Sequence, residues 1–382
     1  MVFRKSNYFL TLFAIILISS CSDNNDSNPL NETSYDRGKI IESTLRNTLS
    51  TSDIQFIVNA ISPNTSLDLK YSVDVFSVEY YTTDYFNNEQ IASGAIFVPK
   101  DLDDLSILSL QHGTETRSSN AASVSYLNSF EGIGGAIFGS LGYFMLVPDY
   151  LGFGVSEVDH PYMHAESLTP GIIDFIRAGK NFSNDENISL NGNLFLAGYS
   201  EGGYLTLAAQ KDIEQNYSGE LILTGVAPMA GPYDFIGTVD TILSRGEYST
   251  PYYVSYVLKA YNEIYNWNRL DDFFQSPYNT TVNTLYNGNY STQEVVNQLP
   301  SSITDLLKSE FVDNYFLGNE TELRKALTDN TLLNWTPSAP IHFFHGDKDD
   351  AVFYFNAVKA KEVFSSKGSN VRLTTIPGGT HG

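Results

Sequence analysis

The chain has 382 residues, of which 42% are hydrophobic, so it is long enough to bury the core of one large domain. Its formal net charge is −22 at pH 7. A negative field of this size repels phosphate, so we expect neither a nucleic-acid partner nor adsorption to anionic lipid through surface charge. Because the sequence has a single cysteine, a disulfide within the chain is excluded.

The first twenty residues are predicted to be a targeting segment and not part of the fold. Two basic residues precede the apolar stretch Phe9–Ile18, which is too short to span a bilayer as a helix. The Ile-Ser-Ser-Cys sequence that ends at Cys21 resembles the lipobox of bacterial lipoproteins, in which the cysteine is lipidated after cleavage. We therefore expect a signal peptide over residues 1–20, a lipid on Cys21 and a flexible polar tether over residues 21–34. The alternative is an ordinary secretory signal with an incidental cysteine.

This segment also predicts where the protein is located. Acyl chains on one residue hold a protein at a membrane without a spanning helix. We expect anchoring to the bacterial cell envelope, at the periplasmic or surface face of the outer membrane, with membrane contact through the lipid alone.

The first part of the domain is predicted to begin with a pair of strands. Residues 35–61 are mixed, with apolar side chains at helical spacing at Ile40, Ile41, Leu45 and Leu49. Two segments then alternate between polar and apolar residues, which is typical of half-buried antiparallel strands. The predicted elements up to the middle of the chain are strands at 69–82, 90–99, 107–110 and 143–147, a helix within 124–142 and a helix that starts at Pro170.

The second half of the sequence predicts a mostly parallel sheet that is interrupted by an insertion. Apolar strands are expected at 194–197, 221–229, 339–344 and 370–376. Alternating strands and helices after an antiparallel pair indicate an α/β fold with helices on both faces of the sheet. The residues between 231 and 339 lack a clear strand and are rich in tyrosine. We expect a helical cap over 236–335, between core segments 35–235 and 336–382, with tyrosines that pack the cap or line a substrate site.

A candidate nucleophile lies where an apolar strand turns into a helix. Gly198-Tyr-Ser200-Glu-Gly202 follows the strand at 194–197 and precedes an apolar helical pattern. Strand, sharp turn and helix are the context that a G-x-S-x-G nucleophile elbow requires, because the strained turn exposes the serine hydroxyl. A glycine-rich connection with a serine N-cap is the alternative interpretation.

The partners of this serine are expected downstream, in the order acid and then histidine. Three aspartates, Asp347, Asp349 and Asp350, follow the strand at 339–344 and compete for the role of the acid. His381 follows two glycines after the last strand, where a loop could bring its imidazole to Ser200 as general base.

Acyl transfer also needs hydrogen-bond donors for the oxyanion. One is expected to be the backbone N–H of Glu201, the residue after the nucleophile, and the other the backbone N–H of Thr114 in the loop after the third strand. A plain strand-end turn is the alternative for that loop.

With these residues in place, the chain resembles the α/β-hydrolase superfamily over roughly residues 70–382. The stretch from Pro148 to Gly154, Pro-Asp-Tyr-Leu-Gly-Phe-Gly, together with His160-Pro-Tyr, is similar to that of the secretory lipase and esterase branch. The resemblance implies cleavage of carboxylic esters by a triad of Ser200, Asp349 and His381, with Glu201 and Thr114 as oxyanion donors. Asp349 is favoured because it occupies the acid position of the H-G-x-x-D-x-x-V arrangement of these hydrolases. No metal or organic cofactor is implied, and the expected substrate is a small ester or a lipid.

The sequence also suggests three other hypotheses. His160 and His164 lie four residues apart, but Pro161 between them disfavours a helical metal site, so hydrogen bonding is preferred. A serine peptidase on the same fold would use the same order of residues, but it normally has a large N-terminal propeller. A catalytically inactive binding protein would not need an intact serine, acid and histidine.

Overall fold

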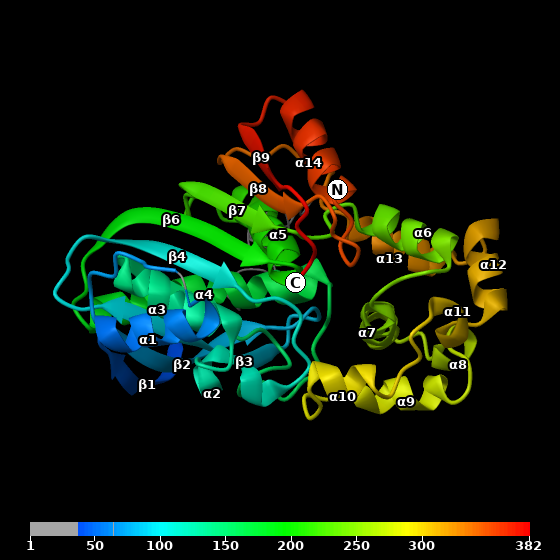
Figure 1. Cartoon of the computed structure of the whole chain (residues 1–382), viewed down its shortest axis with the longest axis horizontal. Helices are drawn as coiled ribbons and strands as arrows, with labels where there is room; N and C mark the ends of the chain where they lie inside the picture. The colour runs from blue at the N-terminus through cyan, green and yellow to red at the C-terminus, as the bar shows by residue number, and fades with distance from the viewer. Residues whose placement is uncertain (1–36, 64) are drawn as a thin grey trace, which may run out of the picture. The chain divides into compact units, whose positions relative to one another are not determined.

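The computed structural model describes residues 37–63 and 65–382, so the predicted signal peptide, Cys21 and the tether lie outside the described residues. Within them the chain forms a nine-stranded sheet with the order β1-β2-β3-β5-β4-β6-β7-β8-β9 (Figure 1). The strands are β1 (Ile40–Leu49), β2 (Val73–Thr83), β3 (Glu89–Pro99), β4 (Leu105–Gln111), β5 (Tyr143–Pro148), β6 (Leu190–Tyr199), β7 (Gly225–Met229), β8 (Ile341–Gly346) and β9 (Val371–Ile376).

The sheet combines an antiparallel edge with a parallel body. β1, β2, β3 and β5 pair in turn as antiparallel neighbours. From β5 through β4 and β6 to β9, every pair is parallel. The carboxyl ends of β6, β8 and β9 therefore lie at one edge of the sheet, which is where the candidate site residues follow these strands. The predicted α/β class and mostly parallel sheet are confirmed.

Residues 40–49, which precede the predicted strand pair, are not helical, although the spacing of their apolar side chains indicates a helix. They form the strand β1. β1 is the edge strand of the sheet, and eight of its ten residues are exposed, Leu45 among them at 53%. Its conformation is stabilised by backbone pairing with β2, so the positions of its apolar side chains do not mark a buried helical face.

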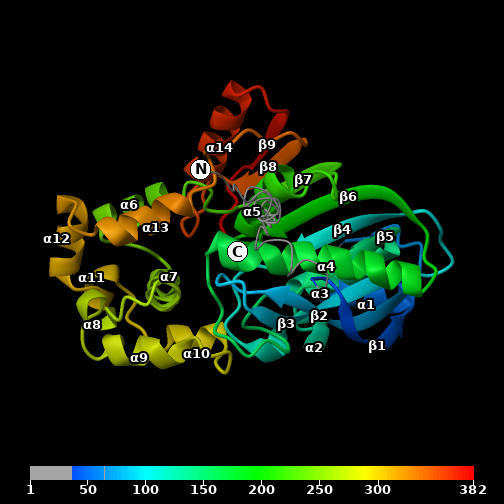
Figure 2. The same cartoon turned by 180° about the vertical axis from the view of Figure 1, so that it is seen from behind.

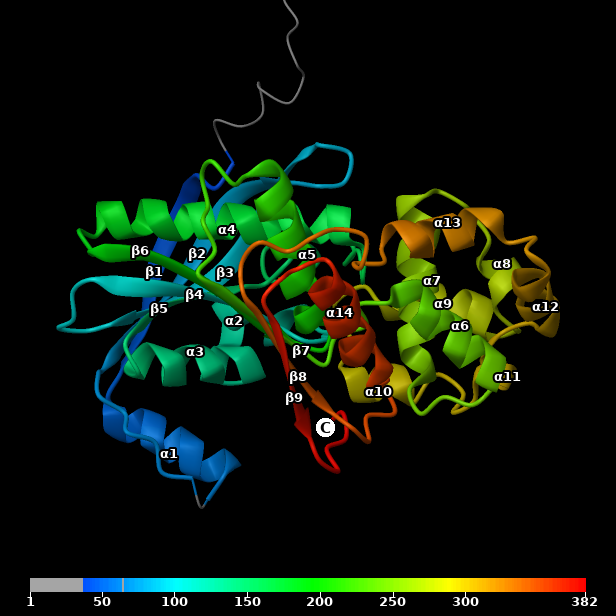
Figure 3. The same cartoon turned by 90° about the horizontal axis from the view of Figure 1, so that it is seen from above.

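Helices cover both faces of the sheet (Figure 3). On one face α4 (Ala165–Asp185), α5 (Glu201–Asn216) and α14 (Phe355–Ser366) pack into the larger apolar core. On the other face α1 (Thr51–Ile61) and α3 (Phe130–Ser140) contribute to a smaller core.

Two of the predicted helices have other bounds. The helix expected within 124–142 is divided into α2 (Ala122–Ser125) and α3, because Ser129 caps the start of α3 by accepting a hydrogen bond from the Gly132 N–H. α4 begins at Ala165, and Pro170 lies inside it instead of at its start. Pro170 removes only one backbone hydrogen bond in the second turn, and burial of Leu168 stabilises the preceding turn.

Between β7 and β8 the described chain forms eight helices, which we call the helical insertion. They are α6 (Phe235–Arg245), α7 (Pro251–Ile264), α8 (Leu270–Phe273), α9 (Tyr278–Leu285), α10 (Thr292–Val296), α11 (Ile303–Leu306), α12 (Ser309–Leu317) and α13 (Thr321–Asp329). Figures 1 and 2 show them gathered on the side toward which β4 and β6 point. This places the insertion over the edge of the sheet that carries Ser200.

The central helix of the insertion is α7. Nearly all of its residues are buried, including Lys259, which forms ion pairs with Asp159 and Glu263. The reason is that side chains of α7 belong to the larger apolar core and that α7 also contacts α8 and α9. No helix within residues 37–63 and 65–382 is both long and apolar enough to cross a bilayer.

Candidate active site

Ser200 lies in the sharp turn between β6 and α5. Its φ of 58° and ψ of −120° are strained for an L residue, and its N–H donates to the Met229 carbonyl oxygen at 2.9 Å. A Cβ on Gly198 would lie 2.3 Å from the Gly202 carbonyl oxygen, and one on Gly202 would lie 2.0 Å from the Gln111 carbonyl oxygen. Both glycines are therefore required for the close approach of α5 to the strands, and the predicted strand, turn and helix are present.

His381 contacts Ser200 from the loop after β9. Its Nε2 lies 2.9 Å from the Ser200 Oγ, and the Tyr199 hydroxyl donates to its backbone carbonyl oxygen. The same loop is tied to the loop after β8, because the Gly378 N–H donates to Asp347 Oδ1 at 2.7 Å. These contacts hold the imidazole beside Ser200, and the His381 side chain is 14% exposed.

Asp349 lies on the other side of the His381 ring. Its Oδ2 is 2.8 Å from His381 Nδ1, and its Oδ1 accepts hydrogen bonds from the Ala351 and Val352 N–H groups. Burial alone would raise the pKa of Asp349, but the hydrogen bonds from His345, His381 and Val352 outweigh it and lower the pKa to about 2. Asp349 is therefore a carboxylate at neutral pH, as an acceptor for the Nδ1–H must be.

The other two aspartates of this loop are engaged elsewhere. Asp347 accepts from the Gly378 N–H, and the Asp350 backbone carbonyl accepts from the Ser249 hydroxyl. His345 donates from Nε2 to the Val352 carbonyl oxygen at 2.8 Å and lies 3.1 Å from Asp349 Oδ2. The structure thus brings together Ser200, His381 and Asp349, and not Asp347 or Asp350.

The loop after β4 supplies one candidate oxyanion donor. A Cβ on Gly113 would lie 3.8 Å from the Ser200 Cβ, so this loop runs beside the nucleophile. The Gly113 N–H is occupied, because it donates to Glu131 Oε1 at 2.9 Å. Neither the Thr114 N–H nor the Glu201 N–H has a hydrogen-bond partner among the described residues, which leaves both available to a ligand. Glu131 was missed in the sequence, where nothing in its helical neighbourhood distinguishes it.

His112, at the start of this loop, faces a backbone carbonyl oxygen with each of its ring nitrogens. Its Nδ1 lies 2.7 Å from the Gly113 carbonyl oxygen and its Nε2 lies 2.9 Å from the Asp149 carbonyl oxygen. Because a neutral imidazole donates from only one nitrogen, the ring must be protonated to form both bonds. Burial alone would lower the pKa of His112, but the carboxylates of Glu131 and Glu201 raise it above its ordinary value.

The two histidines considered for a metal site have separate partners. His160 Nε2 lies 2.8 Å from Glu201 Oε1, whereas His164 contacts the Ser167 and Tyr265 hydroxyls at 2.8 and 3.0 Å. Over residues 37–63 and 65–382, no group of three His, Cys, Asp or Glu side chains is arranged to hold a metal ion.

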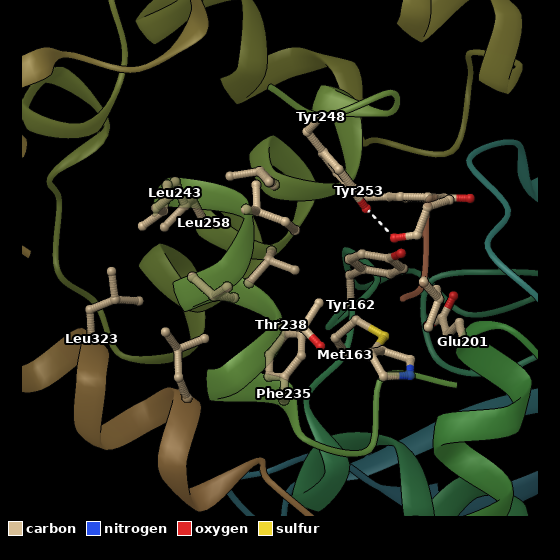
Figure 4. A pocket seen from close by; sticks show the side chains of 18 of the residues that line it. Tyr162, Met163, Glu201, Phe235, Thr238, Leu243, Tyr248, Tyr253, Leu258 and Leu323 are labelled. Carbon is tan, nitrogen blue, oxygen red and sulfur yellow. Dashed lines mark hydrogen bonds between the residues drawn. The ribbon is translucent and has the colours of Figure 1, made fainter. Parts of the chain in front are cut away.

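A narrow cavity, which we call the insertion cavity, leads from Ser200 into the helical insertion. Ser200 and Glu201 line it on the side of the core, and most of the other lining side chains are apolar and come from α6, α7, α12 and α13. Figure 4 shows Glu201 at one end and Leu243, Leu258 and Leu323 at the other. The space open to the centres of water molecules is only about 60 Å³, so a slender apolar group fits better than a ring.

A wider and more polar cavity, the His381 cavity, lies beside Tyr199 and His381. It is lined by His381, Tyr199 and the loop from His112 to Glu115, and its volume by the same measure is about 610 Å³.

Tyrosines border the insertion cavity, where Tyr162 stacks on Tyr256 with ring centroids 4.2 Å apart. Tyr253 lines the insertion cavity, whereas Tyr256 packs between the rings of Tyr162 and Tyr286.

Similar chains are found among solved structures. A protein of Legionella pneumophila is 25% identical, with a TM-score of 0.84 over 90% of this chain and 93% of that one. The rice cell wall degrading esterase LipA from Xanthomonas oryzae is 26% identical, with a TM-score of 0.81 over 90% of this chain and 92% of that one. These similarities confirm the α/β-hydrolase fold.

Sequence comparison points in the same direction. The secreted triacylglycerol lipase LIP1 of Malassezia furfur is 26% identical over 249 residues, which cover 61% of this chain and 46% of the relative. The chain thus spans about half the length of this curated relative. The model of the secretory lipase family matches residues 137–378, more than half of the chain and the part that contains Ser200 and Asp349. The chain belongs to the secretory lipase family.

Proposed function

We propose that the protein hydrolyses carboxylic esters through Ser200, His381 and Asp349. The observation that carries this proposal is the continuous set of contacts from Ser200 Oγ to His381 Nε2 at 2.9 Å and from His381 Nδ1 to Asp349 Oδ2 at 2.8 Å. Ser200 has a strained backbone conformation and lines an apolar cavity. Membership of the secretory lipase family and similarity to a named esterase and a named lipase support the same chemistry.

In the proposed reaction each group has a role that its position supports. His381 takes the proton of Ser200 as Oγ attacks the ester carbonyl carbon, and returns it to the alcohol oxygen when that bond breaks. Asp349 keeps Nδ1 protonated and stabilises the imidazolium, and the N–H groups of Thr114 and Glu201 hold the oxyanion. Water, activated by His381, then releases the acid from the acyl-enzyme. The narrow insertion cavity suits the acyl chain, and the wider His381 cavity suits the alcohol.

Labelling with a fluorophosphonate probe tests the nucleophile. We expect the wild type and a Ser366→Ala control to be labelled and Ser200→Ala not to be, with hydrolysis of p-nitrophenyl butyrate reduced at least ~10⁴-fold. Labelling of Ser200→Ala at the wild-type rate would contradict the proposal.

The identity of the acid is tested by two neighbouring substitutions. Asp349→Asn should lower kcat about 10⁴-fold, because an amide at this position favours the wrong tautomer of His381. Asp350→Asn should change kcat less than about threefold, because only the backbone carbonyl of Asp350 forms a hydrogen bond in the described structure. Equal losses in the two variants would mean that Asp349 is not the acid.

We also propose that Cys21 carries a lipid that anchors the protein to the cell envelope. The lipobox-like sequence before Cys21 supports this, and membership of a secretory family is consistent with export. When the protein is expressed from its full sequence in a bacterium, we expect it to partition into the detergent phase of Triton X-114 and Cys21→Ala to remain in the aqueous phase. Identical partitioning would refute the anchor.

A further inference from the structure

An acidic side chain lies where negative charge should oppose the proposed reaction. Glu201 is 1% exposed, and its backbone N–H is one of the two proposed oxyanion donors. By ordinary covalent dimensions its carboxyl group lies within about 6 Å of that N–H. An uncompensated carboxylate at this distance would repel the oxyanion that forms when an ester is attacked.

His160 is the partner of this carboxyl group. Its Nε2 lies 2.8 Å from Glu201 Oε1, and the two side chains are 1% and 0% exposed. Its Nδ1 lies 2.7 Å from the Leu151 carbonyl oxygen, which can only accept, so Nδ1 carries a proton. One further proton then lies between Nε2 and Oε1. Whichever atom holds it, His160 and Glu201 together have no net charge.

Compensation of the negative charge of Glu201 depends mainly on its contact with His160. Glu201 Oε2 is buried and has no hydrogen-bond partner among the described residues. The other nearby cation is His112, but its charge also faces Glu131, whose carboxylate raises the pKa of His112. Loss of His160 would therefore leave a buried carboxyl group with little compensation.

The surroundings of His160 hold its ring in this orientation. Phe153 packs against it with ring centroids 4.6 Å apart, and Tyr256 of the helical insertion contacts it edge-on at 5.8 Å. A Cβ on Gly152 would lie 2.5 Å from the His160 backbone nitrogen, so the backbone of this loop is also closely packed. The ring is thus fixed toward Glu201.

From these observations we infer that His160 is a positioning residue, which compensates the charge of the Glu201 carboxyl group so that an oxyanion can form beside it. The inference rests on the proposed ester hydrolysis. It adds His160 to the residues that support the reaction, although His160 does not contact the reacting atoms. Because a neutral ester carries no charge before attack, loss of this compensation should affect kcat and not KM.

A double-mutant cycle tests the inference with the full-length chain and p-nitrophenyl butyrate. His160→Gln should lower kcat roughly 30-fold when residue 201 is Glu, with KM changed less than about twofold; at 1.36 kcal/mol per tenfold this corresponds to about 2 kcal/mol. When residue 201 is Gln, the same substitution should lower kcat less than about threefold, because no carboxyl group remains to be compensated.

His164→Gln is the matched control, because His164 is also a buried histidine but contacts Ser167 and Tyr265 instead of Glu201. Its effect should be the same with Glu and with Gln at position 201. Thermal unfolding should show that each variant is folded, and His160→Asn replaces His160→Gln if the latter does not fold. An equal loss of kcat in both backgrounds, or a change in KM alone, would overturn the inference. If Ser200→Ala retains hydrolysis, the proposed function itself is wrong.

Discussion

Buried histidines in this protein differ in charge because their hydrogen-bond partners differ. Both ring nitrogens of His112 face backbone carbonyl oxygens, which requires a protonated ring. His164 instead faces the Ser167 and Tyr265 hydroxyls, which can donate or accept, so nothing compels a second proton. Burial lowers the pKa of His164 to about 4, with only a small opposing effect from Asp329.

The low pKa of His164 predicts a loss of stability in acid. An unfolded histidine takes up its proton near pH 6.5, whereas the folded protein does so only near pH 4. Between these values the unfolded state binds more protons, so the free energy of unfolding should fall as the pH falls, by as much as ~3 kcal/mol from this group. His164→Gln should remove this part of the pH dependence, as measured by urea unfolding from pH 8 to pH 4.

His342→Gln is the control for that measurement. His342 lies on β8 and contacts the Thr374 hydroxyl in an exposed position. We expect this variant to retain the wild-type slope of stability against pH. A slope unchanged in His164→Gln would show that the low pKa of His164 does not affect stability.

Single residues of the site were predictable where their chemistry dictates a local sequence. The turn at Ser200 needs glycines on both sides, and a loop histidine needs to follow a strand that ends at the same edge of the sheet. Glu131 and the pairing of His160 with Glu201 could not be predicted, because these contacts join segments 18 and 41 residues apart without any periodic pattern. The choice among Asp347, Asp349 and Asp350 depended on a family arrangement, since local sequence alone treats the three alike.

At the scale of elements, the junction of β6 with α5 is the feature most sensitive to a small change. A Cβ on Gly202 would lie 2.0 Å from the Gln111 carbonyl oxygen, which belongs to the backbone of β4 and cannot rotate away. Gly202→Ala should therefore lower the free energy of unfolding by about 3 kcal/mol, because α5 must move away from the sheet. Urea unfolding measures this loss.

Gly219→Ala is the matched control, because no heavy atom lies within 4 Å of its Cβ position. Its free energy of unfolding should stay within about 0.5 kcal/mol of the wild type. A Gly202→Ala variant as stable as this control would mean that the turn can relax without loss.

The differences between the expected and the observed elements have separate physical causes. In β1 the edge position allows apolar residues to be exposed, so a helical spacing of Ile40, Ile41, Leu45 and Leu49 carries no information about burial. In α4 the turn before Pro170 is stabilised by burial of Leu168, which outweighs the preference of proline for the first turn. β4 and β5 were predictable because nearly all of their residues are buried, which produces nearly continuous apolar runs. In β7 and the second half of β6, buried residues alternate with half-buried ones.

At the scale of the molecule, the candidate substrate cavity belongs to neither the core nor the insertion alone. Ser200 and Glu201 come from the β6–α5 junction, whereas Leu243, Leu258 and Leu323 come from three helices of the insertion (Figure 4). The sequence predicted that such helices exist but not which side chains enter the cavity, since that depends on the packing of α6, α7 and α13. The choice of acyl group should therefore be determined by the insertion and the chemistry by the core.

This division predicts that the length of the preferred acyl chain can be changed without changing the nucleophile. Leu258 lines the end of the insertion cavity away from Glu201, so Leu258→Trp should shorten the space for a linear chain (Figure 4). We expect the ratio of kcat/KM for p-nitrophenyl laurate to that for p-nitrophenyl butyrate to fall at least ~10-fold. Leu317→Trp makes the same substitution on α12 at a side chain that is 75% exposed, and should keep the wild-type ratio. If Leu258→Trp lowers kcat/KM for both esters by the same factor, the acyl chain does not extend into this cavity, and the His381 cavity must accommodate it instead.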